Sequence, residues 1–341
     1  MQKKMIDIAI SDAYADRFNV HKSQVDMSLN DADDAIAFMV SQLAHLEPKL
    51  YEVKYANIVF EELVPIDTSI NEAAQTVNYR SFDGVTMGKF IGANADDLPT
   101  VAQNMQLHTV QLGYAGAATR YSLDELRTSA FLGQPIDQTQ ARLAFRGAKE
   151  HQQKIVLYGD ADRGMGGLLN HENVTKTTSS TDWNTATADK ILEDVNNFLS
   201  DIWVDSNQAF MPNTLLIDTK RFTKIATTRL NDVTSQTILE FIKENNIAKL
   251  QGGIDLDIRA LPQLMGAQMK ALGGQTNAYD RMVAYEKNPE NLVAYMPIAP
   301  RFVAPQYEGL TVVTPMEYKI SGTEFRYPGC AAYCDFSVAM S

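Results

Sequence analysis

The feature that most constrains this chain is a long polar excursion between two segments with strand character. Thr76–Phe82 is mostly polar, and Met105–Leu112 alternates with the two-residue period of a strand that has apolar side chains on both faces. The residues between them are rich in glycine, aspartate and asparagine. Such a hairpin cannot bury its own tip, and an isolated hairpin is only marginally stable in water. We therefore predict that the limb Thr76–Leu112 lies across a neighbouring subunit.

The N-terminal segment also has too few apolar residues to form a core of its own. Residues 1–32 are polar and show no periodicity, which indicates either an extended arm that neighbours order or a frayed chain terminus. Asp33 begins a predicted short helix that ends at Pro48. An extended segment is expected next, over Val53–Val64.

The middle of the chain predicts helices. Ser122–Glu125 has the pattern of a capping box and predicts a short helix that runs to Leu132. Ile136–Tyr158 contains no proline and predicts a helix roughly 35 Å long. Its small apolar side chains form a narrow stripe, typical of a helix that lies on a sheet rather than inside a core. The stripe consists of Ala141, Ala144, Ala148 and Ile155.

Residues 185–300 predict an α/β layer, and the stretch after them predicts strands. Leu215–Ile217 is a candidate buried strand, and Asp218 or Thr219 can cap the helix that follows. Other apolar positions repeat with helical or strand periods. The helical sets are Ile191, Val195, Phe198 and Ile202, then Ile238, Phe241 and Ile242; the strand sets are Ile254, Leu256 and Ile258, then Leu310, Val312 and Thr314, then Phe325 and Tyr327.

The charge balance excludes several classes of protein. The chain has 42 acidic and 30 basic residues and a net charge of −12, which disfavours binding to nucleic acids and anionic membranes.

No apolar run approaches the ~18 residues needed to span a bilayer, and the short stretch after Lys3 and Lys4 is too charged for a signal peptide. Cys330 and Cys334 have no further Cys or His cluster to complete a zinc site, so we expect two half-buried thiols. These observations favour folding in the cytoplasm.

Two glycine-containing segments are candidates for chemistry. Gly84–Lys89 has too few residues between its glycines for a phosphate loop, and Phe90 stands where Ser or Thr would bind magnesium. In the loop Gly159–Gly167, Asp160 and Asp162 could hold a divalent cation together with Glu172. Aspartate and glycine are also what an ordinary turn after a helix uses. The histidines share no spacing and no nucleophile motif occurs, so we predict no metal, no cofactor and no catalytic residue.

The order of these elements resembles that of the major capsid proteins of tailed phages, the Hong Kong ninety-seven type of fold. It is most similar to a branch first described as phage proteins of unknown role. Short motifs in order along nearly the whole chain carry the resemblance, mainly toward the C-terminus. They are Tyr285–Pro289, Pro297, Pro305–Gln306, Gly309, Gly322 and Arg326–Pro328, with Leu63–Ile66 and Gly166–Asn170 before them.

The resemblance implies an α+β fold with a defined division of the chain. It comprises an N-terminal arm (1–52), the first strand of a peripheral domain (53–72), an extended hairpin loop (73–112), the peripheral domain with a long spine helix (113–184), an α/β axial domain (185–300) and returning strands of the peripheral domain (301–341).

The resemblance also implies a structural subunit that is not an enzyme. Such a subunit assembles as pentamers and hexamers into an icosahedral head around double-stranded DNA. Candidate inter-subunit contacts are Phe82, Met87, Lys89, Phe90 and His151. In some shells of this type a hairpin lysine joins covalently to a neighbour's asparagine. Lys89 has a suitable position, but no partner asparagine or catalytic glutamate can be singled out, and exposed loop lysines usually serve solubility.

Partners and location follow from the same resemblance. We expect a virion protein that meets portal and decoration proteins, and a separate scaffold, because no long helical scaffolding segment precedes the arm. No membrane contact is expected. Two alternatives stay open. One is a metal-dependent α/β enzyme that uses the Gly159–Gly167 loop, and the other is a cargo-enclosing nanocompartment shell of the same fold.

Overall fold

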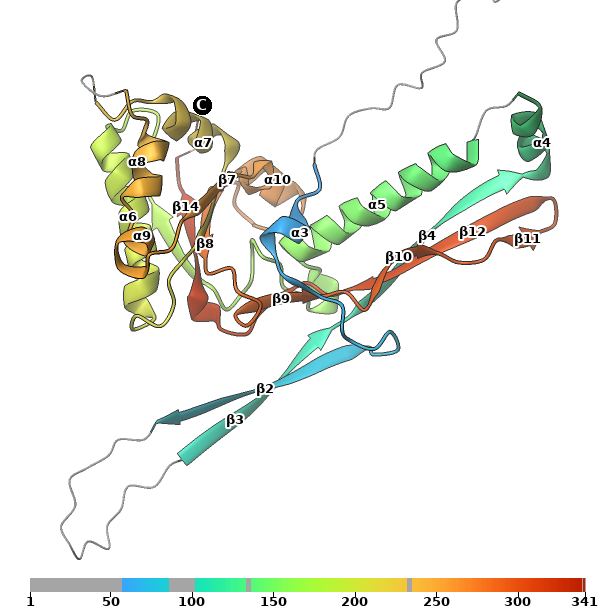
Figure 1. Ribbon diagram of the computed structural model, residues 1–341, viewed down its shortest axis with the longest axis horizontal. Helices are drawn as coiled ribbons and strands as arrows, with labels where there is room; N and C mark the ends of the chain where they lie inside the picture. The colour runs from blue at the N-terminus through green and yellow to red at the C-terminus, as the bar shows by residue number, and fades with distance from the viewer. Residues whose placement is uncertain (1–56, 86–101, 133–135, 232–234, 339, 341) are drawn as a thin grey trace, which may run out of the picture. The chain divides into compact units, whose positions relative to one another are not determined.

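The computed structural model describes residues 57–85, 102–132, 136–231, 235–338 and 340. Within these residues the chain combines helices with four sheets, which confirms the predicted α+β class (Figure 1). The arm predicted at 1–52, its helix and the first residues of the next segment lie outside the described residues. Among the described helices, none has both the length and the hydrophobicity needed to cross a bilayer.

A five-stranded sheet divides two cores. Its strands, in spatial order, are β5 (Thr175–Ser179), β14 (Ala331–Phe336), β8 (Asp280–Tyr285), β6 (Thr214–Ile217) and β7 (Asp257–Ala260). Successive side chains of a strand point to opposite faces. Leu215 and Met282 therefore pack into one core, whereas Leu216 and Val283 pack into the other.

Helices cover one face of this sheet. They are α6 (Ala188–Asp205), α7 (Thr219–Thr227), α8 (Ile238–Glu244) and α9 (Ile247–Gly252). The predicted apolar face of α6 is buried against the sheet, and Asp218 caps α7 by accepting hydrogen bonds from the backbone N–H groups of Lys220 and Arg221 at 3.1 and 3.0 Å. Shorter turns complete this region: η2 (Pro262–Leu264), α10 (Gly266–Ala271) and η3 (Pro328–Cys330).

The strand predicted from Ile254 starts later than expected. The Ile254 N–H donates to the Ala248 carbonyl, and Gly253 adopts the left-handed conformation that ends α9. Ile254 therefore still belongs to the helix terminus, and β7 begins only at Asp257.

The C-terminal strand β14 has partners that its position in the sequence did not indicate. It pairs antiparallel with β8 and parallel with β5, although residues 301–341 were expected to return to the region of the long helix. Five of its six residues are buried, and a strand buried on both faces belongs in the centre of a sheet. Cys330 and Cys334 are buried as well, with 0% and 7% exposure, so the prediction of half-buried thiols was wrong.

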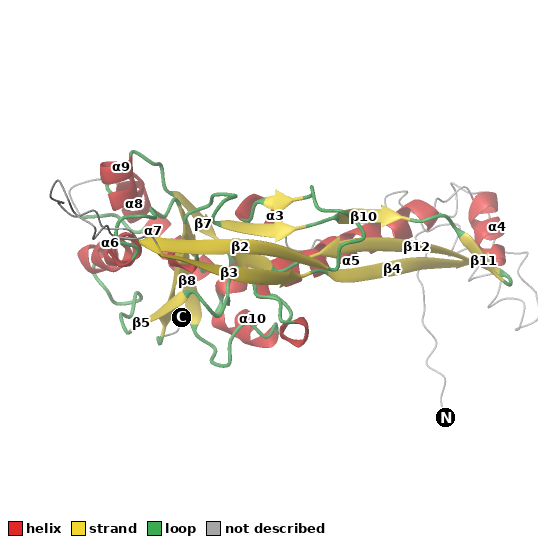
Figure 2. Cartoon of the chain, turned by 90° about the horizontal axis from the view of Figure 1, so that it is seen from below, coloured by secondary structure: helices red, strands yellow, loops and turns green. Residues whose placement is uncertain are grey.

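A long strand pair supports the spine helix. β4 (Gly113–Ser122) pairs along its whole length with β12 (Thr311–Ile320), and β10 (Ile298–Phe302) and β11 (Gln306–Glu308) pair with the other edge of β12. Helix α5 (Ile136–Tyr158) lies along this ladder (Figure 2). Ala144 and Ala148 pack on Met316 and Tyr318, as the small-residue stripe predicted.

The last turn of α5 departs from that prediction. Ile155, Val156, Leu157 and Tyr158 are all buried in the main core, which the five-stranded sheet also lines, so this end of the helix is enclosed on all sides. The short helix α4 (Leu123–Leu132) begins with the predicted capping box. Ser122 and Glu125 exchange side-chain to backbone hydrogen bonds at 2.9 and 3.1 Å.

The segment predicted as extended over Val53–Val64 contains a helical turn, α3 (Phe60–Leu63). Residues three apart in a helix share a face, so Phe60 and Leu63 both enter the main core. Strand β1 (Ile66–Asp67) follows and pairs with β9 (Leu292–Tyr295), which also pairs with β13 (Thr323–Phe325). Burial of the turn therefore outweighed the strand character of the sequence.

Replacing Arg221 with methionine should strongly destabilise the subunit. The guanidinium is 1% exposed, donates to Asp218 and Asp280 at 2.8 and 2.7 Å, and lies over the Phe336 ring. Its loss leaves the two carboxylates without a compensating charge, which costs about 3–5 kcal/mol for a buried pair. Urea unfolding of unassembled subunits measures the change.

The matched control is Arg120→Met. Arg120 pairs with Glu308 at 2.9 Å on the surface, and both side chains are more than half exposed. Such pairs contribute about 0–1 kcal/mol. Equal unfolding free energies for the two variants would contradict the conclusion that Arg221 stabilises the core by compensating the charges of Asp218 and Asp280.

The two cysteines should not react with a thiol reagent at pH 8 while the protein is folded. Burial raises the pKa of the Cys330 thiol to about 12 and that of Cys334 to about 11, so the reactive thiolate is scarce until the solution is far more alkaline. Both thiols should react after denaturation, which a chromogenic disulfide reagent measures. Rapid modification of the folded protein would instead show that η3 or β14 opens.

Candidate assembly surface

The predicted hairpin is present and its strands pair only with each other among the described residues. β2 (Thr76–Val85) and β3 (Ala102–Gln111) form an antiparallel ladder from Thr76 opposite Gln111 to Val85 opposite Ala102. The ladder extends the predicted strand Thr76–Phe82 toward the tip. A two-stranded ribbon has two open edges and two faces that water reaches unless something else covers them.

One face of the hairpin packs on the rest of the subunit at its base. Val77 and Tyr79 from β2 and Val110 from β3 contact Val293 and Tyr295 of β9. The apolar side chains on this face are therefore explained by contacts within the subunit.

The opposite face carries large apolar side chains that are exposed among the residues that the structure describes. Phe82 lies opposite Met105, and Leu107 lies opposite Arg80, so these side chains share one face. Phe82, Met105 and Leu107 are 74%, 63% and 64% exposed. We call these three residues the hairpin patch. Large neighbouring apolar side chains that are left in water mark an interaction surface.

Sequence reasoning identified only one member of this patch as a contact residue. Phe82 was a candidate, whereas Met105 and Leu107 were not, although their alternation in the sequence would have placed them together. The other hairpin candidates, Met87, Lys89 and Phe90, lie outside the described residues.

A hydrogen bond joins the hairpin to the body. The Tyr79 hydroxyl donates to the Glu324 carboxylate on β13 at 2.7 Å, and burial together with this carboxylate raises the pKa of the Tyr79 phenol. The Tyr79 ring stacks on His108 of the other strand, with ring centroids 4.8 Å apart. The imidazole Nε2 of His108 lies 2.8 Å from the Ser81 hydroxyl.

Charged groups fix the loop that leads into the hairpin. Arg301 on β10 donates two hydrogen bonds to the Glu72 carboxylate at 2.9 and 2.7 Å and a third to Glu317 at 2.8 Å. The hydrogen bond from Arg301 lowers the pKa of the Glu72 carboxyl. The pKa of the Glu317 carboxyl is also lowered, mainly by the hydrogen bond from the Tyr114 hydroxyl and next by the one from Arg301. The Lys319 ammonium also donates to the Glu72 carbonyl oxygen.

His151, the remaining candidate contact, has a partner within its own subunit. Its Nδ1 lies 2.8 Å from the Tyr318 hydroxyl, which links α5 to β12. Burial and the neighbouring Lys154 charge lower the pKa of the imidazole, which favours its neutral form. In the structure His151 thus connects α5 to β12 within the subunit. It is far in the sequence from the residues of the hairpin patch.

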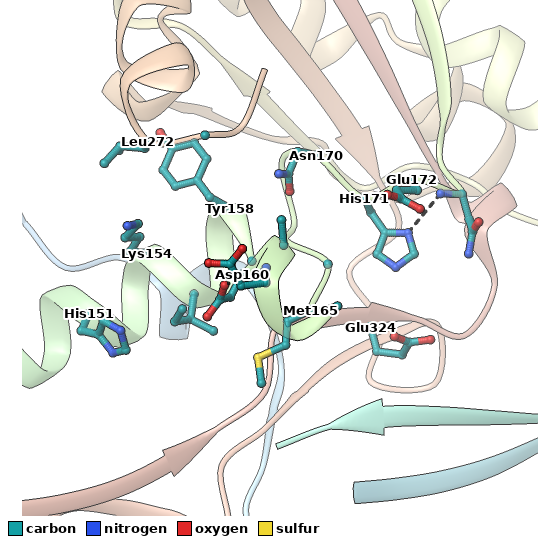
Figure 3. A pocket seen from close by; sticks show the side chains of 18 residues that line it. His151, Lys154, Tyr158, Asp160, Met165, Asn170, His171, Glu172, Leu272 and Glu324 are labelled. Atoms are coloured by element: carbon teal, nitrogen blue, oxygen red, sulfur yellow. Dashed lines mark hydrogen bonds between the residues drawn. The ribbon is translucent and has the colours of Figure 1, made fainter. Parts of the chain in front are cut away.

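The glycine loop after α5 borders an open cavity of about 670 Å³ (Figure 3). Polar side chains of both charges line it, among them His151, Lys154, Asp160, Glu172 and Glu324. His171 is 8% exposed, and its Nδ1 accepts a hydrogen bond from the Asn173 N–H, drawn as a dashed line in Figure 3.

The acidic residues of this loop serve a turn and do not gather around a metal position. Asp160 caps the turn η1 (Ala161–Arg163) by accepting from the Asp162 N–H at 3.2 Å, and Arg163 lies 3.5 Å from the same carboxylate. Throughout the part of the chain that the structure describes, no three His, Cys, Asp or Glu residues come together as a metal site would require. The metal-dependent enzyme alternative therefore has no support here.

Comparison with known proteins places these features in a family. The family model of the major capsid protein matches residues 87–336. The capsid of Myoviridae Phage XM1 is similar in structure, with a TM-score of 0.72 and 11% identity over 87% of this chain and 97% of that one. No curated protein sequence matches the chain.

Other solved structures give the same result. Mycobacterium phage Ogopogo aligns with a TM-score of 0.58 and 15% identity over 88% of this chain and 98% of that one. The capsid of the native GTA particle gives 0.61 and 11% identity over 89% and 99%. At these identities the likeness shows the fold, and the family model covers most of the sequence. The chain is a structural protein of the phage capsid and belongs to the major capsid protein family.

Proposed function

We propose that this capsid subunit assembles as pentamers and hexamers into an icosahedral head that encloses double-stranded DNA, with the hairpin patch as a contact between copies. The exposure of Phe82, Met105 and Leu107 on the face of the ribbon opposite its contacts with β9 carries this proposal. A closed shell repeats each contact many times, so modest contacts sum to a stable assembly.

Two further observations support the shell. The native GTA particle, whose capsid chain is similar to this one, was computed with C5 symmetry, which is compatible with pentamers. The net charge of −12 suits a container, because phosphate groups are repelled by an acidic surface and packaged DNA stays free to slide.

We infer the roles of the regions from the same comparison. The five-stranded sheet with α6 to α9 is the axial domain, which gathers around the symmetry axes. The β4–β12 ladder with α5 is the peripheral domain. Because β5 and β14 pair within this sheet, we propose that the axial domain includes them in addition to 185–300. We also propose contacts with portal, scaffold and decoration proteins, assembly in the host cytoplasm, and His151 together with the hairpin candidates as contact residues.

Electron microscopy of purified particles tests the proposal directly. Round shells with five-fold vertices and nuclease-protected DNA are the expected result. Shells that contain other proteins and no DNA would indicate a cargo compartment instead. A steady monomer or dimer at all concentrations would reject assembly altogether.

Replacing Phe82 or Leu107 with serine should impair assembly. Each variant removes a large apolar side chain from the proposed contact, and burying such a side chain contributes about 1.5–3 kcal/mol. The subunit concentration needed for shell formation should therefore rise at least about tenfold. Light scattering as a function of subunit concentration measures it.

Gln106→Ser is the matched control. Gln106 lies on β3, is exposed and polar, and points to the face opposite the hairpin patch. Its substitution should leave the assembly threshold unchanged. If the Phe82 and Leu107 variants assemble as readily as the Gln106 variant, the hairpin patch is not a contact between copies.

A further inference from the structure

The contacts at the base of the hairpin differ in how strictly they can fix its angle to the rest of the subunit. Apolar burial of Val77 and Val110 against Val293 is non-directional and permits small changes of angle. A hydrogen bond requires a narrow range of distance and angle. Among the described residues, the Tyr79–Glu324 bond is the one side-chain hydrogen bond that joins β2 or β3 to the rest of the subunit.

Both partners of this bond are held firmly. Glu324 stands between Thr323 and Phe325, which are 1% and 2% exposed. The Thr323 hydroxyl donates to the Val156 carbonyl of α5 at 2.8 Å. Glu324 also lies opposite Val293 in the β13–β9 ladder, so its backbone is fixed on two sides.

The hairpin partner spans both strands of the ribbon. Tyr79 on β2 stacks nearly parallel on His108 of β3, with 13° between the ring planes. His108 in turn contacts the Ser81 hydroxyl. A constraint on the Tyr79 hydroxyl therefore acts on the ribbon as a unit and not on a single strand.

We propose that Tyr79 and Glu324 form a latch that sets the direction in which the hairpin leaves the subunit. Tyr79 and Glu324 are positioning residues, because they act through the hairpin patch and do not themselves belong to it. The geometry of the hydrogen bond selects one hairpin angle from those that the apolar base allows. Without the bond, the population of other angles rises about fivefold, as expected for loss of one ordinary hydrogen bond.

Spin labels on the unassembled subunit test the latch. Asn104→Cys places one label on β3, and Asn197→Cys places the other on α6, both at exposed positions. The native cysteines are buried and should remain unlabelled. Pulsed electron spin resonance then gives the distribution of distances between hairpin and body.

Four variants separate the latch from a general structural role. Tyr79→Phe and Glu324→Ala should broaden the distance distribution. Glu324→Gln keeps an acceptor oxygen and should preserve a narrow one. Thr109→Val removes a hydrogen bond to Asn78 that stays within the hairpin, so it should also preserve the narrow distribution.

A narrow distribution for Tyr79→Phe would overturn the proposal, even if the melting temperature fell. The consequence for assembly rests on the proposed shell function. Shells of the Tyr79→Phe variant should vary in diameter on micrographs, while wild-type shells are uniform. Failure of the wild type to form shells would reject the shell function and leave the spin-label result to decide on the latch.

Discussion

The burial of the turn at Phe60–Leu63 holds together the parts of the subunit that carry the hairpin. Phe60, Leu63 and Val64 are 0–1% exposed within the main core. The Tyr285 hydroxyl of β8 donates to the Leu63 carbonyl at 2.8 Å, and the Val59 N–H donates to the Gln153 side chain of α5 at 2.8 Å. Apolar burial supplies most of the free energy at such a site, and the hydrogen bonds satisfy backbone groups that water no longer reaches.

The same turn connects the spine helix to the five-stranded sheet through its charged side chains. Glu61 pairs with Lys149 of α5, and Glu62 pairs with Arg259 of β7. The chain then passes along β1 and enters the loop that Arg301 fixes through Glu72. The base of the hairpin is thus anchored to β9 and β13, while among the described strands β2 and β3 pair only with each other. This contrast suits a limb that transmits a fixed direction to a neighbouring copy.

The success and failure of sequence reasoning follow the range of the interactions involved. The capping box at Ser122 and the cap at Asp218 depend on residues two or three positions away. The first was predicted correctly, and for the second the sequence left Asp218 and Thr219 as alternatives, of which the structure shows Asp218. The hairpin strands and the helix over Ile136–Tyr158 were also predicted, because a regular period is visible in a single sequence. The position of β14 was missed, since its partners β8 and β5 lie about 50 and 155 residues away.

The amino-acid sequence by itself determined the α+β class, the exposed hairpin, the spine helix and, through its resemblance to tailed-phage capsid proteins, the family. Those features rest on local periods, caps and the order of elements. Only the tertiary structure decided that Phe60–Leu63 is helical, that Phe82, Met105 and Leu107 share an uncovered face, and that Tyr79 meets Glu324. Each of these depends on which distant residues become neighbours, and that choice minimises the free energy of the whole chain and not of any one segment.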